Sequence, residues 1–552
     1  MTCSMVSGVK STVFRERNTE RNIFLYFIFF YSLYKRSKTI SSKIQVKEAK
    51  SMNLKKRLYL KLVLFLAIIT VLNLSLVAQT FDAVKSRVKV HTLKSGMKFI
   101  VLERHEAPVV SFHIYADVGS ANESYGITGI SHLLEHMAFK GTKIVGTKDY
   151  EAEKTILVEL DALFDQIKGE KAKAKPDAKK LEEMEKKFEA LRKKAKEYVI
   201  TSEADNMLMK EGDRIINAYT SNDATQYIDS LPSNKVEFWM AMMSDRFFNP
   251  VFREFFKERD VVMEERRLGV ETRPTGRMFE DFFATAFKAH PYGHSVVGHM
   301  SDLENITRRD VEQYFKKFYG PSNLTVGIVG DVKAEEVFKM AEVYFGRIPS
   351  GPRPEPVRTK EPEQWGERQV IIEAKSQPRI IIGYHRPDYR HKDNIPLEAL
   401  ANILGQGRSS RLYELLVKDK KVAVTVMSFN GFPGEKYSNL IAFYVIPSRG
   451  HTSAECLELI DEEIEKVKKE LVTSDELTKF KRGNVKSLLN EMKSNSSMAA
   501  LLTYAEVVLG GLDAAFDQIE QIRAVTPEEV KYVANKYLIK KHRTIGEIVP
   551  EK

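Results

Sequence analysis

An internal repeat constrains the fold of this chain more than any other feature. Residues 306–329 contain Ile-Thr-Arg-Arg-Asp-Val, then Lys-Phe, then Thr-Val-Gly-Ile-Val. Residues 525–548 contain Val-Thr-Pro-Glu-Glu-Val, then Lys-Tyr, then Thr-Ile-Gly-Glu-Ile, at a constant offset of 219 residues. Each copy predicts a helix, a turn and a final strand. A chain of 552 residues with this repeat is expected to form two similar domains.

The domain limits follow from the repeat and from composition. The first domain is predicted at 85–330 and the second at 368–552, joined by a linker at 331–367 that is rich in proline and glycine. Hydrophobic periodicity predicts the elements of the first domain. They are strands within 88–116, helices at 128–139 and 150–167, an edge strand and its return at 212–232, helices at 234–247, 254–271, 277–288 and 307–318, and a strand at 324–329.

A charged segment interrupts this pattern. Residues 168–200 are dominated by Lys, Glu and Ala, with Pro176 within the segment and a narrow apolar stripe from Leu181 to Leu191. We expect two antiparallel helices that project as a hairpin inserted in the first domain. A solvated helical face explains the charges more simply than a partner-binding arm.

The excess of basic residues lies near the N-terminus. The formal charge is +11, but residues 1–80 hold 14 Lys and Arg against 3 Asp and Glu, whereas residues 81–552 hold 72 of each. The body of the chain therefore gives no electrostatic reason to expect a nucleic-acid partner.

The N-terminal segment resembles an export signal. Residues 1–51 are predicted to be an upstream extension that ends before Met52. Residues 52–78 have a basic start and an apolar run, and cleavage is expected after Ala78. The pattern predicts an exported, periplasmic protein. An uncleaved membrane anchor at 62–78 and an organelle transit peptide are the alternatives.

The cysteine content excludes an internal disulfide in the exported chain. Only Cys3 and Cys456 are present, and Cys3 lies in the leader. Cys456 is followed at helical spacing by apolar residues, so it is predicted to be a small buried hydrophobic residue.

The sequence His132-Leu-Leu-Glu-His136 is the strongest chemical motif. Two histidines four residues apart lie on one face of a helix, and Glu135 lies beside them. Neutral imidazoles are zinc ligands, and a neighbouring carboxylate can accept a proton from a zinc-bound water. This is the inverted H-x-x-E-H order of zinc peptidases. The second half of the chain contains no such motif.

Such a site needs a third protein ligand from elsewhere in the chain. The segment Glu258-Arg-Asp-Val-Val-Met-Glu-Glu predicts a helix, and Glu258 and Glu265 are two turns apart on one face. One carboxylate could bind zinc while the other orients a ligand. Spacing alone does not choose between Glu264 and Glu265.

Three motifs in order carry a family resemblance. His132-Leu-Leu-Glu-His-Met-Ala-Phe-Lys-Gly-Thr, then Asn217-Ala-Tyr-Thr, then the Glu258 segment resemble the pitrilysin/insulinase family of zinc peptidases. The similarity covers residues 85–552 and is greatest to the half-length group that includes mitochondrial processing peptidase and bacterial periplasmic relatives. It implies an α+β fold of two tandem homologous domains, each a mostly antiparallel sheet covered by helices.

The resemblance also implies the roles of individual residues. One zinc ion per chain would be bound by His132, His136 and Glu265, with Glu135 as general base and Glu258 supporting the ligands. Asn217, Ala218, Tyr219 and Thr220 would form an edge strand that pairs with substrate, although an ordinary structural strand is the alternative. The 128 residues between His136 and Glu265 exceed the family's usual spacing, and the charged insertion would supply most of the excess.

One departure from the family concerns the second half. Active members use an arginine and a tyrosine, seven residues apart, to hold the substrate carbonyl, and this sequence has Val417 and Val424 there. We therefore expect a dimer, with an identical or related chain that supplies the Arg/Tyr pair. The predicted function is zinc-dependent endopeptidase activity on peptides or unfolded segments. The alternative is a non-enzymatic assembly or peptide-binding member of the same fold.

Overall fold

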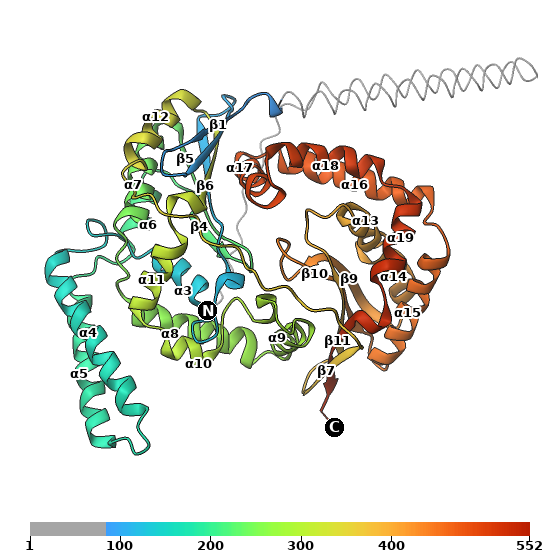
Figure 1. The fold of residues 1–552 in the computed structure, drawn as a ribbon, viewed down its shortest axis with the longest axis horizontal. Coiled ribbons are helices and arrows are strands. Elements are labelled where there is room, and N and C mark those ends of the chain that lie inside the picture. The colour runs from blue at the N-terminus through green and yellow to red at the C-terminus, as the bar shows by residue number, and fades with distance from the viewer. Residues whose placement is uncertain (1–83, 552) are drawn as a thin grey trace, which may run out of the picture. The chain divides into compact units, whose positions relative to one another are not determined.

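The structure is a computed structural model that describes residues 84–551. The predicted extension at 1–51, the predicted signal peptide at 52–78 and Cys3 lie outside the described residues. The described chain contains two β-sheets, each with helices packed on it (Figure 1). This confirms the predicted α+β class with two similar halves.

The first sheet has six strands in the order β1-β2-β6-β3-β5-β4. Its neighbours are antiparallel except for the parallel pair β2 and β6. The strands are β1 (Val88–Thr92), β2 (Lys98–Glu103), β3 (Val109–Ala116), β4 (Asn217–Thr220), β5 (Thr225–Pro232) and β6 (Leu324–Gly330).

The second sheet has five strands in the order β7-β11-β8-β10-β9, with one parallel pair, β7 and β11. They are β7 (Arg368–Ala374), β8 (Arg379–Arg386), β9 (Ala423–Phe432), β10 (Asn439–Pro447) and β11 (Arg543–Pro550). This order matches that of β2, β6, β3, β5 and β4 in the first sheet. The match shows that the repeat extends well beyond its closing motif.

The helices of the first half include the closing helix of the first repeat. The α-helices and one π-helix are α3 (Ile130–Ala138), α4 (Tyr150–Lys171), α5 (Ala178–Lys196), α6 (Glu203–Lys210), α7 (Val236–Phe248), α8 (Phe255–Arg266), the π-helix η3 (Arg267–Glu271), α9 (Pro274–Ala286), α10 (Met300–Asn305), α11 (Arg308–Phe318) and α12 (Ala334–Tyr344). Short 3₁₀ turns are η1 (Ser120–Asn122), η2 (Ser233–Lys235), η4 (Pro291–Gly293) and η5 (Pro321–Asn323).

The helices of the second half follow the same plan. They are α13 (Asn394–Gly405), α14 (Arg411–Tyr413) with the π-helix η6 (Glu414–Asp419), α15 (Ser453–Lys469), α16 (Ser474–Glu491), α17 (Asn495–Tyr504) with the π-helix η7 (Ala505–Leu509), α18 (Leu512–Ala524), α19 (Pro527–Tyr537) and the 3₁₀ turn η8 (Lys540–His542). No single helix among residues 84–551 is long and apolar enough to cross a membrane. One pair of helical segments has the length and apolar composition of a membrane span only when its two parts are counted together. This pair, Asn495–Leu509 and Leu512–Ala524, is sharply bent between its parts.

The repeated closing helices begin with the same local structure. Thr307 caps α11 and Thr526 caps α19, each accepting a hydrogen bond from the backbone N–H three residues on. In both helices an acidic side chain, Asp310 or Glu529, bonds back to the capping residue. This capping box satisfies backbone donors that a helix start otherwise leaves unpaired. The threonine in each repeat copy therefore determines where the helix begins.

Each half contributes one helix to the sheet of the other half. Helix α17 packs on β3 and β6 of the first sheet, and α9 packs on β7 and β11 of the second. Glycine in each final strand permits this close approach. A Cβ on Gly327 would lie 2.7 Å from the Ala499 carbonyl oxygen, and one on Gly546 would lie 3.1 Å from the Phe282 Cβ. These glycines occupy the same position in the repeat.

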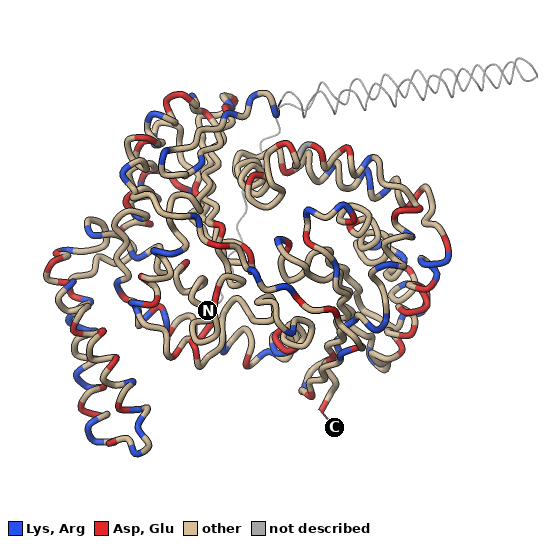
Figure 2. The backbone as a smooth tube through the Cα atoms, viewed as in Figure 1, with Lys and Arg blue, Asp and Glu red and all other residues tan. Residues whose placement is uncertain are grey.

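The charged hairpin projects from the first half as α4 and α5 (Figure 1). Acidic and basic residues are interspersed along both helices (Figure 2). The hairpin differs from the prediction in its extent, because its first helix is the whole of Tyr150–Lys171 rather than a new helix after residue 168. An aromatic cluster of Phe164, Phe188 and Phe256 packs its base against α8.

Two further features differ from the predictions. Part of the predicted linker at 331–367 is helix α12, because Val337, Ala341 and Phe345 recur at helical spacing and are buried in the first core. Helix α6 was not predicted. The expectation for Cys456 is confirmed, since its side chain is fully buried in the second core.

Candidate metal centre

Helix α3 carries the two histidines and is held firmly at its start. Gly129 precedes it with a φ of 89°, and a Cβ there would lie 2.5 Å from the Val297 carbonyl oxygen, so the position requires glycine. The Glu123 carboxylate accepts hydrogen bonds from the backbone N–H groups of Gly129 and Ser131, both at 2.8 Å. These contacts fix where the histidines lie.

His132, His136 and Glu265 come together although 128 residues separate the last two. One ligating atom from each lies within 4.8 Å of the others. The Nε2 atoms of both histidines are 3.7 Å from the same carboxylate oxygen of Glu265. Two imidazole nitrogens and a carboxylate oxygen that converge on one point are a donor set suited to zinc.

The position of Glu264 separates the two candidate carboxylates. Its Oε2 accepts a hydrogen bond from Arg267 at 2.6 Å on the exposed side of α8. Glu265, one residue later, faces the histidines instead. The structure therefore brings Glu265, and not Glu264, to the histidine pair.

Glu258 lies against the other ring nitrogen of His136. Its Oε2 is 3.6 Å from His136 Nδ1, and its Oε1 is 2.6 Å from Lys140 Nζ. Burial acts to raise the pKa of Glu258, but the His136 and Lys140 contacts prevail and hold it at about 2. The anionic carboxylate can therefore orient His136 so that Nε2 points toward Glu265.

The two histidines differ in their environment. Burial lowers the pKa of His132 to about 4, and the neighbouring His136 adds to this effect. His132 is therefore neutral near pH 7, as a metal ligand must be. His132 Nδ1 is buried and has no hydrogen-bond partner among the described residues. Contact with Glu258 raises the pKa of His136, and a metal ion would compete with that proton.

Glu135 lies between the histidine pair and the sheet edge. It is 9% exposed and accepts a hydrogen bond of 2.6 Å from Thr220 Oγ1. Burial raises its pKa, and the negative charge of Glu265 contributes in the same direction. A carboxylate with a raised pKa is a stronger proton acceptor than an ordinary glutamate. The Thr220 contact is a feature that spacing could not predict.

The predicted substrate strand is the edge strand of the first sheet. Strand β4 pairs only with β5, so its other edge has no strand neighbour among the described residues. Asn217 and Tyr219 are exposed, whereas Ala218 and Thr220 are half-buried. Helix α3 contacts β4 directly. A peptide that pairs with this edge would pass beside Glu135.

Other residues of interest lie outside this cluster. His290 and His294 flank the turn η4, and His290 Nδ1 accepts a hydrogen bond from the Tyr292 N–H. Val417 packs on the second core, and Val424 is 56% exposed on β9. Neither valine side chain can donate a hydrogen bond.

Two family models match the chain. One, described as insulinase (peptidase family M16), matches residues 98–156 and 190–299. The other, described as peptidase M16 inactive domain, matches residues 305–484. Together they cover more than half of the chain. The unmatched gap lies within the α4–α5 hairpin, which is therefore an insertion relative to that model.

Known proteins resemble the chain over most of its length. The zinc protease PqqE of Helicobacter pylori is 27% identical over 456 residues, which cover 81% of this chain and 89% of that protein. The probable mitochondrial-processing peptidase subunit beta of Arabidopsis thaliana is 24% identical over 479 residues, covering 84% and 78%. A crystal structure of a protease from Helicobacter pylori matches with a TM-score of 0.70 and 25% identity, covering 84% and 99%. A chain of complex III from Candida albicans shares the fold, with a TM-score of 0.63, 13% identity and coverage of 84% and 95%.

Proposed function

Because the chain belongs to the insulinase family, peptidase family M16, we propose that it is a zinc-dependent endopeptidase that hydrolyses peptides or unfolded segments. The observation that carries this proposal is the convergence of His132, His136 and Glu265, with Glu135 beside them. The relatives described as zinc proteases support the same chemistry.

The residues of the first half can be assigned roles in peptide hydrolysis. The chemistry that a bound zinc ion would supply is polarisation of the scissile carbonyl and activation of a water molecule. His132, His136 and Glu265 would hold the ion, and Glu258 would keep His136 oriented. Glu135 would accept the proton of the attacking water and pass it to the leaving amine.

Substrate would bind as an additional strand on β4. Main-chain hydrogen bonds along Asn217–Thr220 hold an extended backbone with little demand on its side chains. This mode suits peptides and unfolded segments, whose backbone groups are free. Thr220 would link the bound strand to Glu135 through its existing hydrogen bond.

We further propose that the active form is a dimer with an identical or related chain. Val417 and Val424 stand where active relatives have arginine and tyrosine, so this chain lacks donors for the substrate carbonyl. A relative described as a subunit of mitochondrial-processing peptidase agrees with paired chains. The leader sequence supports the further proposal that the protein is exported to the periplasm.

A second candidate function is non-enzymatic assembly or peptide binding. The match of residues 305–484 to an inactive-domain model and the shared fold with a complex III chain favour it. Against it stands the complete donor set of the first half. Zinc content together with peptide cleavage, measured with and without a related partner chain, separates the two functions.

The decisive variant is Glu135→Gln in the chain purified without its predicted leader. Hydrolysis of an unfolded peptide should fall by roughly 10²–10⁴-fold, because the general base is lost, while zinc content is unchanged. Glu264→Gln is the matched control, since it removes an exposed carboxylate on α8 that faces away from the histidines. A Glu135→Gln protein that cleaves at the wild-type rate would exclude this mechanism.

A further inference from the structure

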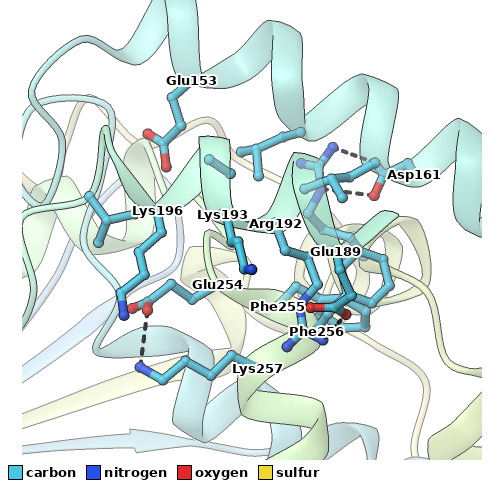
Figure 3. Close-up of a pocket in the computed structure, with 15 residues that line it drawn as sticks. Glu153, Asp161, Glu189, Arg192, Lys193, Lys196, Glu254, Phe255, Phe256 and Lys257 are labelled. Atoms are coloured by element: carbon cyan, nitrogen blue, oxygen red, sulfur yellow. Dashed lines mark hydrogen bonds and ion pairs between the residues drawn. The ribbon is translucent and has the colours of Figure 1, made fainter. Parts of the chain in front are cut away.

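A pocket lies where the inserted hairpin meets helix α8, apart from the metal cluster. Its volume is about 240 Å³ (Figure 3). The apolar part of its lining comes from all three helices: Leu157 and Leu160 of α4, Ala195 of α5, and Phe255 and Phe256 of α8. The family model does not match residues 157–189, so part of this pocket is lined by a segment that is inserted relative to that model.

Each acidic side chain of the pocket already has a basic partner. Glu153 pairs with the buried Arg253, and Asp161 pairs with Arg308. The other two acids are similarly engaged. Their pairs are Glu189 with Arg192 and Glu254 with Lys257.

Two basic side chains of the pocket remain without such a partner. Lys193 and Lys196 line the pocket from one side of α5, three residues apart. No carboxylate among the described residues lies within ion-pair distance of either ammonium group, and Glu254 is engaged by Lys257 and Lys140. Figure 3 shows both lysines on the side of the pocket that faces Glu254 and Lys257. The pocket thus combines an apolar floor with two solvent-exposed lysines that form no ion pair among the described residues.

We propose that this pocket binds a small organic anion with an apolar tail, of the class of a medium-chain fatty acid. The tail would fill the space between the leucines of α4 and the phenylalanines of α8, where burial of apolar surface favours binding. The carboxylate would lie between Lys193 and Lys196, which supply the charge complement. A volume of about 240 Å³ suits a single short apolar chain better than the two chains of a larger lipid.

The ligand would join the insertion to the helix that carries Glu258 and Glu265. Phe255, Phe256 and Lys257 line the pocket and immediately precede Glu258. A molecule that binds only the folded chain stabilises it in proportion to its occupancy. The expected consequence is stabilisation of the contact between α4, α5 and α8.

Binding of decanoate to the full chain, purified without its predicted leader, tests the proposal. Isothermal titration should show one saturable site, with a rise in the thermal unfolding midpoint. Decanol, which has the same chain without the charge, should bind at least about tenfold more weakly. A tenfold loss corresponds to about 1.4 kcal/mol, which is close to the lower limit for a hydrogen bond to a charged group. Equal affinity for decanol and decanoate would overturn the charge-based assignment.

Variants locate the site and separate it from the metal cluster. Lys193→Ala with Lys196→Ala should weaken decanoate binding at least about tenfold. Lys179→Ala with Lys187→Ala is the matched control, because these exposed lysines lie on the same helix but outside the pocket, and it should bind as wild type. Ala195→Trp, which fills the pocket, should also block binding.

Two results would overturn the proposal. One is decanoate binding that survives the Lys193/Lys196 double variant unchanged. The other is binding that disappears in Glu265→Gln, which would place the carboxylate at the metal cluster instead. Because the readout is binding, failure here leaves the peptidase proposal untouched, and the reverse also holds.

Discussion

The two halves of this protein share a fold, but among the described residues only the first half has a cluster of side chains that could hold a metal ion. They have the same strand order, the same capped closing helix and the same glycine in the final strand. At the offset of the repeat, Glu258 and Glu265 of α8 correspond to Leu477 and Asn484 of α16. Leu477 is buried, and the Asn484 side chain donates a hydrogen bond to the Phe480 carbonyl of its own helix. Apart from β1 and the α4–α5 hairpin, the two halves share their architecture, and a few polar side chains distinguish the candidate metal half.

The largest expected difference between the halves is in metal content. Glu265→Gln should reduce zinc affinity by more than roughly 100-fold, because loss of a ligand should exceed the loss of an outer partner. Asn484→Ala, at the corresponding position, should leave zinc content unchanged. Mass spectrometry of metals after dialysis measures both variants. Equal zinc content in the two variants would show that Glu265 contributes no more to zinc binding than Asn484 does.

A smaller effect is expected for the carboxylate that supports His136. Glu258→Gln keeps the shape of the side chain but removes its charge, so zinc affinity should fall by about 10–100-fold. Competition with a fluorescent zinc chelator measures the change. Glu264→Gln serves as the control on the same helix. If both variants bind zinc equally, the contact between Glu258 and His136 has no part in metal binding.

The shared glycines should differ modestly in their tolerance of a methyl group. Gly327→Ala should lower the free energy of unfolding by about 1–3 kcal/mol, because the new Cβ meets the backbone carbonyl of Ala499. Gly546→Ala should cost less, because the side chains of Ile381 and Phe282 that it meets can shift. Urea unfolding of both variants measures the difference. A larger loss of unfolding free energy for Gly546→Ala would contradict this account of how α17 and α9 pack on the sheet of the other half.

The two helix starts should also differ in how pH affects them. Burial raises the pKa of Glu123, which supports α3, to about 8 from an ordinary 4.5. Its contribution to stability is therefore full below pH 4.5 and is lost as the pH rises through 8. At the start of α13, burial acts to raise the pKa of Asp393, but the contacts with Lys536 and Tyr537 outweigh burial and lower this pKa. The contribution of Asp393 to stability is therefore lost only as the pH falls below 3.8.

Glu123→Gln should therefore flatten the decline of unfolding free energy between pH 4.5 and about 8. Asp393→Asn should leave the slope over this window unchanged. Urea unfolding at several pH values measures these slopes. An unchanged slope in Glu123→Gln would show that its carboxylate titrates outside the window.

Much of the fold could be predicted because its signals are local. The repeat and the apolar periodicity place most elements of the first half within a few residues of their observed limits. Composition predicts a linker where helix α12 lies, because the prolines that follow the helix dominate the composition of 331–367. The order of strands, and the packing of α9 and α17 on the sheet of the other half, depend on contacts between distant segments. Local sequence patterns do not predict such contacts.

The candidate site shows the same division. The residue spacing within α3 and within α8 predicts that each helix has one face with metal-ligating side chains. Only the packing of α3 on α8 shows that Glu265, rather than Glu264, faces the histidines. The hydrogen bond from Thr220 to Glu135 joins two motifs 85 residues apart and has no signal in either one. The pocket at the base of the hairpin arises from three helices and could not be inferred from any of them alone.

Anomalous diffraction at the zinc absorption edge, from crystals of the zinc-loaded chain, tests the central claim most directly. The expected result is one strong peak per chain, bonded to His132 Nε2, His136 Nε2 and the Glu265 carboxylate, with none in the second half. No peak at these three side chains, or a full-occupancy peak elsewhere, would contradict the account.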